Sequence, residues 1–292
     1  MPSSFQNKKR LRFIITTSGG ARNRITIEGL RATADIDKAG GMMMGQLSAK
    51  IYGVAQGDMN AVTTLQWRPA KTGDMSYLPN TIEVFAIDGD AESLVFSGNI
   101  VNAWADYQNP PAVFLNVKAM SAMLGQLSAC PPRSFKGEVD VAIVMLQIAE
   151  DLGLTFENNG VTARMSDIYL SGDLVNQARE LANSAGIVLA IDNGVLAICP
   201  RNNPRAGDVP LVSAATGLIG YPAFDGAGII CRMLFNPALR FMGQFQLETE
   251  QTRASGLWTA TSIAYQLESE KPNGAWFQVV RGNFDGAPYV GK

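Results

Sequence analysis

The stretch 187–199, IVLAIDNGVLAIC, carries the clearest signal of local structure in the sequence. Two apolar runs, 187–192 and 195–199, flank the dipeptide Asn193-Gly194. Asn-Gly favours a type I′ turn, because both central residues of that turn need positive φ angles and its twist matches that of the strands it joins. The stretch therefore predicts a two-residue β-hairpin.

Two segments upstream of the hairpin have the apolar spacing of helices. The first, 138–152, ends before Gly153, and the second, 173–185, ends before Gly186. A glycine at this place favours the left-handed residue that closes a helix. Two helices and a hairpin predict a small α+β unit. The apolar positions are Val141, Met145, Ile148 and Leu152 in the first helix and Leu174, Ala178, Leu181 and Ala185 in the second, with Ser171 and Asp173 as candidate N-caps.

Strand-like runs lie on both sides of this unit and predict a mainly β chain. Short strands in such numbers form barrels or sandwiches. The alternation of 24–36 changes parity at Gly29, which predicts a β-bulge there. No sequence repeat relates the upstream and downstream strands. The runs are 11–17, 24–36, 47–51, 81–88, 93–105 and 112–119 upstream, and 209–213, 228–235, 239–250, 257–269 and 275–284 downstream.

Two breaks divide the chain into three predicted domains. The prolines of 130–132 mark the first break, because proline neither continues a helix nor donates to a sheet. The polar stretch 200–208 (PRNNPRAGD) is typical of a linker and marks the second. The predicted domains are a first β domain at 1–125, an α+β insert at 126–205 and a second β domain at 206–292.

Three upstream stretches carry further predictions. Residues 58–67 predict a short helix capped by Asp58 that buries its apolar side chains. The acidic stretch 88–92 lies between apolar runs and lacks the remainder of a calcium loop, so a hairpin turn is the better interpretation. The methionines of 40–45 have two open interpretations, a loosely packed loop tip or a mobile contact for a neighbouring subunit. The apolar positions of the short helix are Met59, Val62, Leu65 and Trp67.

The missing residue types exclude most catalytic chemistry. The chain has no histidine, which excludes serine and cysteine triads and the zinc and iron sites that need histidine. Its three cysteines are too few for a four-thiolate zinc site, and no phosphate-binding loop or dinucleotide fingerprint is present. We therefore predict a non-enzyme with no catalytic, cofactor-binding or metal-binding residues and no cofactor.

Charge and composition limit the partners. Net charge is −2 and no basic face stands out, so stable nucleic-acid binding is not expected; the run Lys8-Lys9-Arg10 is interpreted as a solvated end. No apolar stretch has the length of a membrane span, and no secretory signal is apparent. Charged residues are only 17% of the chain, against about 25% in a usual soluble domain, which suggests surface buried against other chains.

The cysteines Cys130, Cys199 and Cys231 are odd in number, far apart and set in apolar runs. This arrangement favours three reduced thiols in a protein assembled in the cytosol. One disulfide among the three stays an open alternative.

Several segments, in one order over one length, resemble baseplate hub proteins of contractile-tailed phages. The resemblance covers nearly the whole chain, and none of its segments is a chemical motif. The segments are 50–53 (KIYG), 58–60 (DMN), 63–65 (TTL), 102–106 (NAWAD), 154–161 (LTFENNGV), 191–198 (IDNGVLAI), 210–213 (PLVS), 220–222 (GYP), 234–237 (LFNP), 267–270 (LESE) and 274–277 (GAWF).

The resemblance implies a homotrimer. Hubs of this kind carry two β-barrel-like tube domains per subunit, flanking the insert, so that three chains present a pseudo-sixfold ring. Such a ring adapts a sixfold tail tube protein to a threefold tail spike protein, contacts other baseplate proteins and passes genomic DNA only in transit. The expected location is the phage tail baseplate of the virion, after assembly in the host cytoplasm. The expected central channel is neutral or acidic, because DNA must not adhere to it.

Two other function classes stay as alternatives. A carbohydrate- or receptor-binding tail module would stack exposed aromatic rings on sugars, although each tryptophan lies in an apolar or alternating run that favours a place in the core. A cell-wall hydrolase would need only two carboxylates at a set separation, which sequence cannot show. The candidate stacking residues are Trp67, Trp104, Trp258 and Trp276.

Overall fold

A computed structural model describes residues 9–18, 23–39, 44–65, 78–108, 110–127, 130–201, 203–226 and 228–284. The chain divides into two compact units, and several segments cross from one unit to the other. The three-part division at residues 125 and 205 therefore stays a prediction. Unit 1 comprises Met1–Asp37, Gly45–Ser121 and Tyr265–Phe277, and unit 2 comprises Lys38–Met44, Ala122–Ala264 and Gln278–Lys292.

Unit 1 contains a mainly antiparallel sheet with the strand order β17-β3-β4-β7-β6-β5-β1-β2. The predicted upstream strands are confirmed, because alternate residues of each strand enter one core. The bounds are β1 Lys9–Thr16, β2 Arg24–Glu28, β3 Ala32–Ala39, β4 Gln46–Tyr52, β5 Thr81–Asp88, β6 Ala91–Asp106 and β7 Phe114–Met120; β17 spans Gly256–Ser269 and brings residues 265–269 into this unit.

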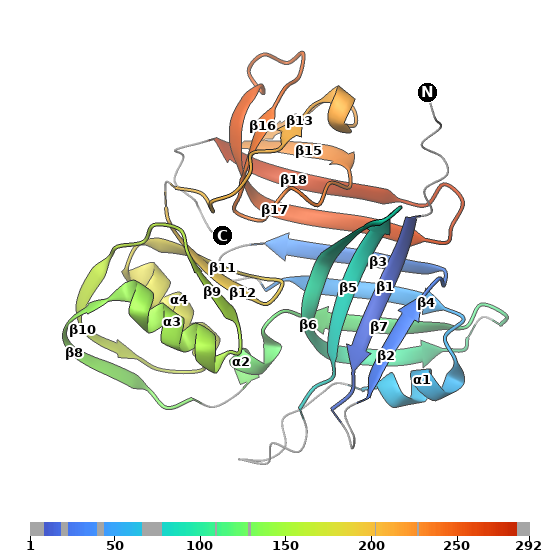
Figure 1. Cartoon of the computed structure of the whole chain (residues 1–292), viewed down its shortest axis with the longest axis horizontal. Helices are drawn as coiled ribbons and strands as arrows, with labels where there is room; N and C mark the ends of the chain where they lie inside the picture. The colour runs from blue at the N-terminus through green and yellow to red at the C-terminus, as the bar shows by residue number, and fades with distance from the viewer. Residues whose placement is uncertain are drawn as a thin grey trace. The chain divides into compact units, whose positions relative to one another are not determined.

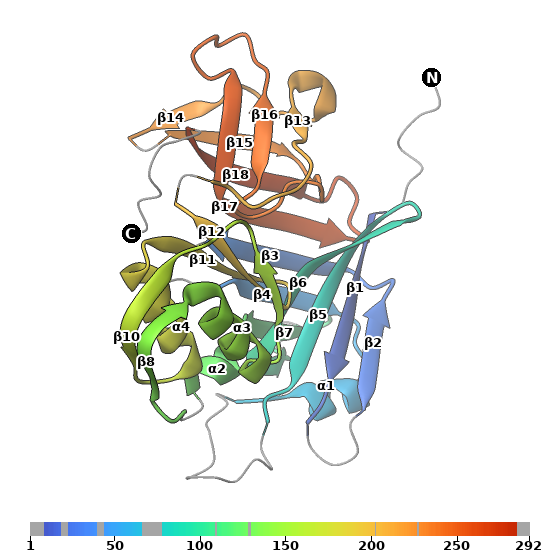
Figure 2. The same ribbon diagram turned by 60° about the vertical axis from the view of Figure 1, so that its left-hand side comes forward.

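This sheet bends at strand β6, which changes its partner along its length. Its residues 91–99 pair with β5, and its residues 99–106 pair with β7 on the opposite side. A register irregularity lies between Ile100 and Asn102. A strand that changes neighbours at such an irregularity turns the corner between two layers. Figures 1 and 2 show the result, with β1, β2 and β5 crossing over β3, β4 and β7.

The sheet bends, but within the described residues it does not close on itself to form a barrel. Among the described residues its strands form an open path with β2 at one end, so the barrel-like domain that we expected is not a closed barrel. The turn at Gly89-Asp90, between β5 and β6, confirms the hairpin interpretation of the acidic stretch. Gly29 lies between β2 and β3 with a φ of 73°, so it is a turn residue and the predicted bulge is wrong.

Helix α1, Gln56–Val62, begins and ends earlier than predicted. Its N-cap is Ala55, so the predicted Asp58 cap is wrong, although Met59 and Val62 are buried as expected. Leu65 is 77% exposed, because the helix has ended before it. Trp67 and the methionines of 42–43 lie outside the described residues.

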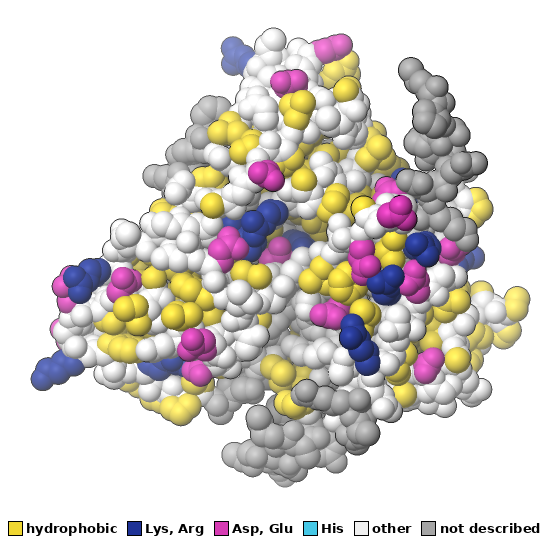
Figure 3. All heavy atoms as spheres, in the orientation of Figure 1, with side chains coloured by type: hydrophobic (Ala, Val, Ile, Leu, Met, Phe, Trp, Pro, Cys, Tyr) yellow, Lys and Arg dark blue, Asp and Glu magenta, His cyan; other side chains and the backbone are white. Residues whose placement is uncertain are grey.

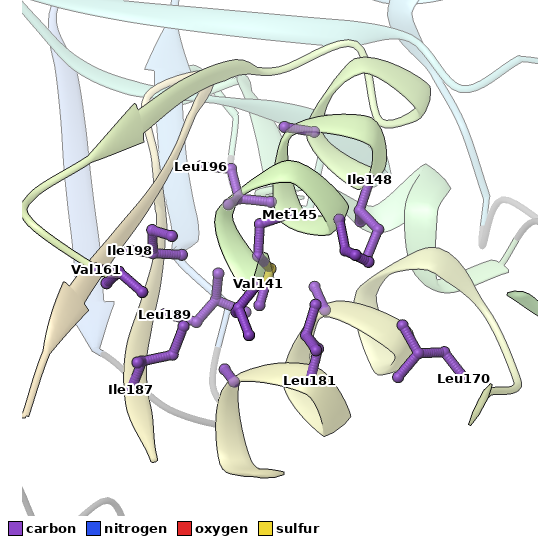
Figure 4. Packing of buried hydrophobic residues seen from close by; sticks show 14 of the residues in the cluster. Val141, Met145, Ile148, Val161, Leu170, Leu181, Ile187, Leu189, Leu196 and Ile198 are labelled. Carbon is purple, nitrogen blue, oxygen red and sulfur yellow. The ribbon is translucent and has the colours of Figure 1, made fainter. Parts of the chain in front are cut away.

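Unit 2 contains the α+β part, whose core Figure 4 shows. The two predicted helices are confirmed as α3, Val141–Asp151, and α4, Leu174–Ser184, and Asp140 and Asp173 accept hydrogen bonds from the backbone at their N-termini. The hairpin is confirmed as β11, Ile187–Asp192, and β12, Val195–Pro200, with positive φ at both turn residues. The side chains of both helices and the hairpin meet in one cluster that includes Val141, Met145, Ile148, Leu181, Leu189, Leu196 and Ile198.

This part also holds a helix and three strands that the sequence did not predict. The helix is α2, Met123–Leu127. Strands β8, Arg133–Asp140, and β10, Arg164–Leu170, form a separate two-stranded sheet, and β9, Thr155–Asn158, pairs in parallel with β12. The predicted helix at 138–152 is therefore a strand up to Asp140.

The downstream strands have the order β14-β15-β18-β17, with β16 paired to β17 and β13 paired to β16. This order repeats the upstream order β3-β4-β7-β6, with β5 paired to β6. We call β3–β7 the first lobe and β14–β18 the second lobe. The shared order appears although the two sequences show no repeat. The remaining bounds are β13 Leu211–Val212, β14 Ala223–Asp225, β15 Gly228–Leu234, β16 Gln244–Leu247 and β18 Trp276–Phe284, with a short 3-10 helix at Ala214–Thr216.

Candidate assembly surfaces

Side chains that could bind a metal ion do not gather in the part of the chain that the structure describes. That part contains no group of three or more Asp, Glu, Cys or His side chains placed to hold a metal ion. None of its helices has the length and hydropathy to cross a bilayer. The candidate site is therefore the exposed apolar surface, together with the contacts that hold it in place.

Exposed large apolar side chains concentrate around β13, β14 and β15. Eleven such residues are exposed in the described ranges, and six of them lie between residues 209 and 234. Tyr221 is 63% exposed and Phe224 is 58% exposed. Exposed apolar side chains that gather in one part of a fold are a common mark of a contact site. The six residues are Val209, Leu211, Ile219, Tyr221, Phe224 and Leu234.

The segment that contains Ile219, Tyr221 and Phe224 is a sheet edge. Among the described strands, β14 pairs only with β15, and Leu218 extends this side through a bridge to Met233. Figure 2 shows β14 at the outer edge of the downstream strands. All three residues of β14 are exposed. We call residues 218–225 the β14 edge; an unpaired strand edge with apolar side chains is a template for pairing with another chain.

A second apolar patch lies on the insert. Ile143 and Leu146 on α3 are 53% and 40% exposed, and Tyr169 on β10 is 61% exposed. Figure 3 shows hydrophobic side chains gathered over this part of unit 2. The opposite side of α3 fills the core, so this helix is apolar on more than the one face that its own core requires.

An ionic joint fixes the insert to the downstream strands. Arg205 donates two hydrogen bonds of 2.7 Å to the carboxylate of Glu157 on β9, and Arg240 donates a third of 3.1 Å to the same group. The Arg205 side chain is only 3% exposed. Its backbone N–H donates to the carbonyl of Met242. Arg205 lies in the stretch 200–208, which the sequence predicted to be a linker, and it is buried and paired there.

The joint changes the acidity of its carboxylate. Hydrogen bonds from Arg205 lower the pKa of Glu157 to about 2, against the opposing effect of burial. Asn159, two residues further on, accepts a hydrogen bond from the N–H of Ala206. The insert and the downstream strands are thus tied by both charge and backbone contacts.

A second ion pair lies at the end of the hairpin. Lys38 and Asp192 approach to 2.7 Å, and their side chains are 7% and 14% exposed. Asp192 is the last residue of β11, directly before the turn. Burial of both partners makes this contact sensitive to loss of either one, because a single buried charge would remain.

The three tryptophans that the structure describes offer no exposed ring for a sugar-binding platform. Trp258 is 5% exposed and Trp276 is 2% exposed, so both belong to the core, as their apolar runs indicated. Trp104 is half-buried, and the Lys118 ammonium lies 5.9 Å from the centre of its ring. A ring that is covered by a cation is poorly available for stacking.

The structure has Cys130, Cys199 and Cys231 as free thiols. Burial raises the pKa of Cys199 to about 11 and that of Cys231 to about 12, whereas Cys130 is half-buried. Because thiolate is the reactive form, we expect iodoacetamide at pH 8 to label Cys130 alone in the native protein and all three in denaturant. Mass spectrometry of labelled peptides measures this. Labelling of native Cys199 or Cys231 in a Cys130→Ser variant would contradict the buried environment.

A family model described as baseplate hub gp41 matches residues 10–277. The chain belongs to this family. The match confirms the resemblance stated above, and it makes the chain a structural component of a phage tail. No curated protein matches the sequence.

Solved structures of tail proteins share the hub fold. A 43 kDa tail protein of prophage MuSo2 from Shewanella oneidensis has a TM-score of 0.62 at 10% identity, covering 93% of this chain and 96% of its own. A tail protein from Neisseria meningitidis has a TM-score of 0.61 at 10% identity, covering 94% and 97%. An Escherichia coli type VI secretion component has a TM-score of 0.58 at 10% identity, covering 89% and 74%. At these identities the likeness concerns the fold.

Proposed function

We propose that this chain is the subunit of a trimeric hub that joins the sixfold tail tube to the threefold spike and leaves a central channel for DNA. The observation that carries the proposal is the repeated strand order of the two lobes. Three copies of a chain with two similar lobes present six similar units around one axis, which is what adaptation between threefold and sixfold partners requires.

Composition supports the same proposal. The low charged fraction and the apolar β14 edge leave surface that is better buried than exposed. Shape, area and strand-edge pairing suffice for such an adaptor, so no reactive side chain is needed. The proposed partners are two further copies, a tube protein, a spike protein and other baseplate proteins. The proposed location is the baseplate of the virion after assembly in the host cytoplasm, and no catalysis is part of this function.

Native mass and particle imaging test the proposal. We expect native mass spectrometry of the purified chain at micromolar concentration to give three times the mass of one chain. Cryo-electron microscopy with tube and spike proteins is expected to show six lobes around a channel with a neutral or acidic wall. A particle that remains at the mass of one chain, or a baseplate in which the copies do not touch, would contradict the proposal.

The alternative sugar-binding function loses support from the same structure. Its candidate residues Trp258 and Trp276 are buried, and Trp104 is covered by Lys118. The proposal of a structural hub does not need an exposed tryptophan.

A further inference from the structure

The two lobes differ on one side of their long strands: the side of β6 that faces away from β7, and the side of β17 that faces away from β18. In the second lobe the long strand β17 has β18 on one side. On its other side, β16 pairs with residues 256–259, and β3 is the neighbour of the part that belongs to unit 1. Both parts of this side are therefore occupied by a strand.

In the first lobe the corresponding long strand is β6, and the last residues of its corresponding side have no strand partner among the described residues. β5 pairs with residues 91–99, in the same way that β16 pairs with the start of β17. Beyond this, the contacts are a bridge from Thr64 to Ala103 and a hydrogen bond from Ile100 to Asn80. No strand of the described part of the chain pairs with residues 104–106 on this side.

The strand that fills the corresponding place in the second lobe is β3, which opens the first lobe. Its equivalent is β14, which opens the second lobe and heads the same strand order. Within the described residues, β14 has an open side, because β15 is its one strand neighbour there, and its residues are exposed. In the described part of the chain, two strand stretches therefore lack a neighbouring strand on one side: residues 104–106 of β6, and β14 on the side that faces away from β15.

We infer that β14 of one copy pairs with residues 104–106 of β6 in the next copy, beyond the bridge from Thr64 to Ala103, as β3 lies beside β17 within a chain. This inference rests on the proposed trimer and names the surface that closes it. Within one chain, β3 already lies beside β17. The inferred contact repeats this arrangement between two copies, with β14 in the place of β3 and β6 in the place of β17. It joins two different surfaces, which is the heterologous type of interface that closes a ring.

The side chains at both surfaces agree with burial in such a contact. Phe224 and Tyr221 are more than half exposed on the β14 edge, and Tyr107, directly after β6, is 50% exposed. Asp225 is the one charged residue of the β14 edge, and its carboxylate accepts hydrogen bonds from the N–H of Gly228 and from Arg281. Backbone hydrogen bonds would supply the pairing, and the aromatic side chains would supply apolar area.

A cysteine pair tests the inference. In a Cys130→Ser background, Ala105→Cys on β6 is combined with Ala223→Cys on β14, and the chain is treated with a short flexible bis-maleimide that tolerates a slip of one residue. We expect covalent trimer on a denaturing gel from the double variant and only monomer from either single variant. The control pair Ser93→Cys with Ala223→Cys uses the half of β6 that β5 already occupies, and it is expected to stay monomeric.

Each outcome decides a separate point. A trimer by native mass that yields no covalent product in the double variant would overturn the inference and leave the proposed function standing. Covalent dimer from Ala223→Cys alone would also overturn it, because β14 would then meet its own copy. A native mass of one chain would contradict the proposed trimer itself, together with the inference that rests on it.

Discussion

Replacing Glu157 with glutamine is expected to destabilise unit 2 by about 3 kcal/mol, because it leaves a buried cation without its carboxylate. Arg205 makes its two short hydrogen bonds to this carboxylate, and its side chain is 3% exposed. Water cannot replace the lost charge at such a site. The neutral amide keeps the shape of the side chain, so the change tests charge and not packing.

Native-state hydrogen exchange measures this effect at the joint itself. The N–H groups of Arg205 and Ala206 are bonded to Met242 and Asn159, and both are expected to exchange faster in the variant. Arg240→Gln is the matched control, since Arg240 bonds the same carboxylate but is 44% exposed. It is expected to change stability by less than about 1 kcal/mol. Equal effects of the two variants would show that burial of Arg205 is not what makes the joint matter.

The pair of Glu157 and Arg205 makes the free energy of unfolding depend on pH. The folded-state pKa of Glu157 is lowered to about 2 from its usual 4.5, so the unfolded chain binds its proton more tightly. The contribution of Glu157 is therefore fully present above pH 4.5 and is lost as the pH falls through about 2. The difference in stability between the natural chain and Glu157→Gln is expected to shrink over this range and to be constant at neutral pH.

Elements with local signals were predicted from the sequence. The helices α3 and α4 have aspartate N-caps and a following glycine, and the hairpin has an Asn-Gly turn, so each is specified within about fifteen residues. The strands of unit 1 alternate because one face is buried. The family was recognisable for a different reason, which is the order of segments along the whole chain.

Elements that depend on distant partners were not predicted. β8 and β10 pair in a two-stranded sheet whose residues are mostly exposed or half-buried, so apolar alternation is weak. Arg205 lies in a polar stretch, and only its distant partner Glu157 shows that it is buried. The shared order of the lobes is a property of backbone pairing, which different side chains can support. No sequence pattern indicates that residues 104–106 of β6 lack a strand partner on one side among the described residues.

Replacing Gly98 with alanine is expected to destabilise unit 1 by about 3 kcal/mol, the upper end for overpacking. A Cβ atom at Gly98 would lie 2.5 Å from the backbone carbonyl oxygen of Met120 on β7 and 2.9 Å from the ring of Phe96. The first contact is with backbone, so no side-chain rotation relieves it. Gly98 lies where β6 passes from β5 to β7, and glycine permits close backbone approach at such a bend.

Urea unfolding measures this change, and Gly57→Ala is the control. Gly57 lies in α1 with open space around the position of a Cβ, so the control is expected to be neutral or to stabilise by up to about 1 kcal/mol. Because the bend at Gly98 sets the direction of residues 99–106, Gly98→Ala is also expected to reduce the crosslink between Ala105→Cys and Ala223→Cys, whereas Gly57→Ala is not. A stable Gly98→Ala chain with an unchanged crosslink would mean that the bend in β6 does not position its open side.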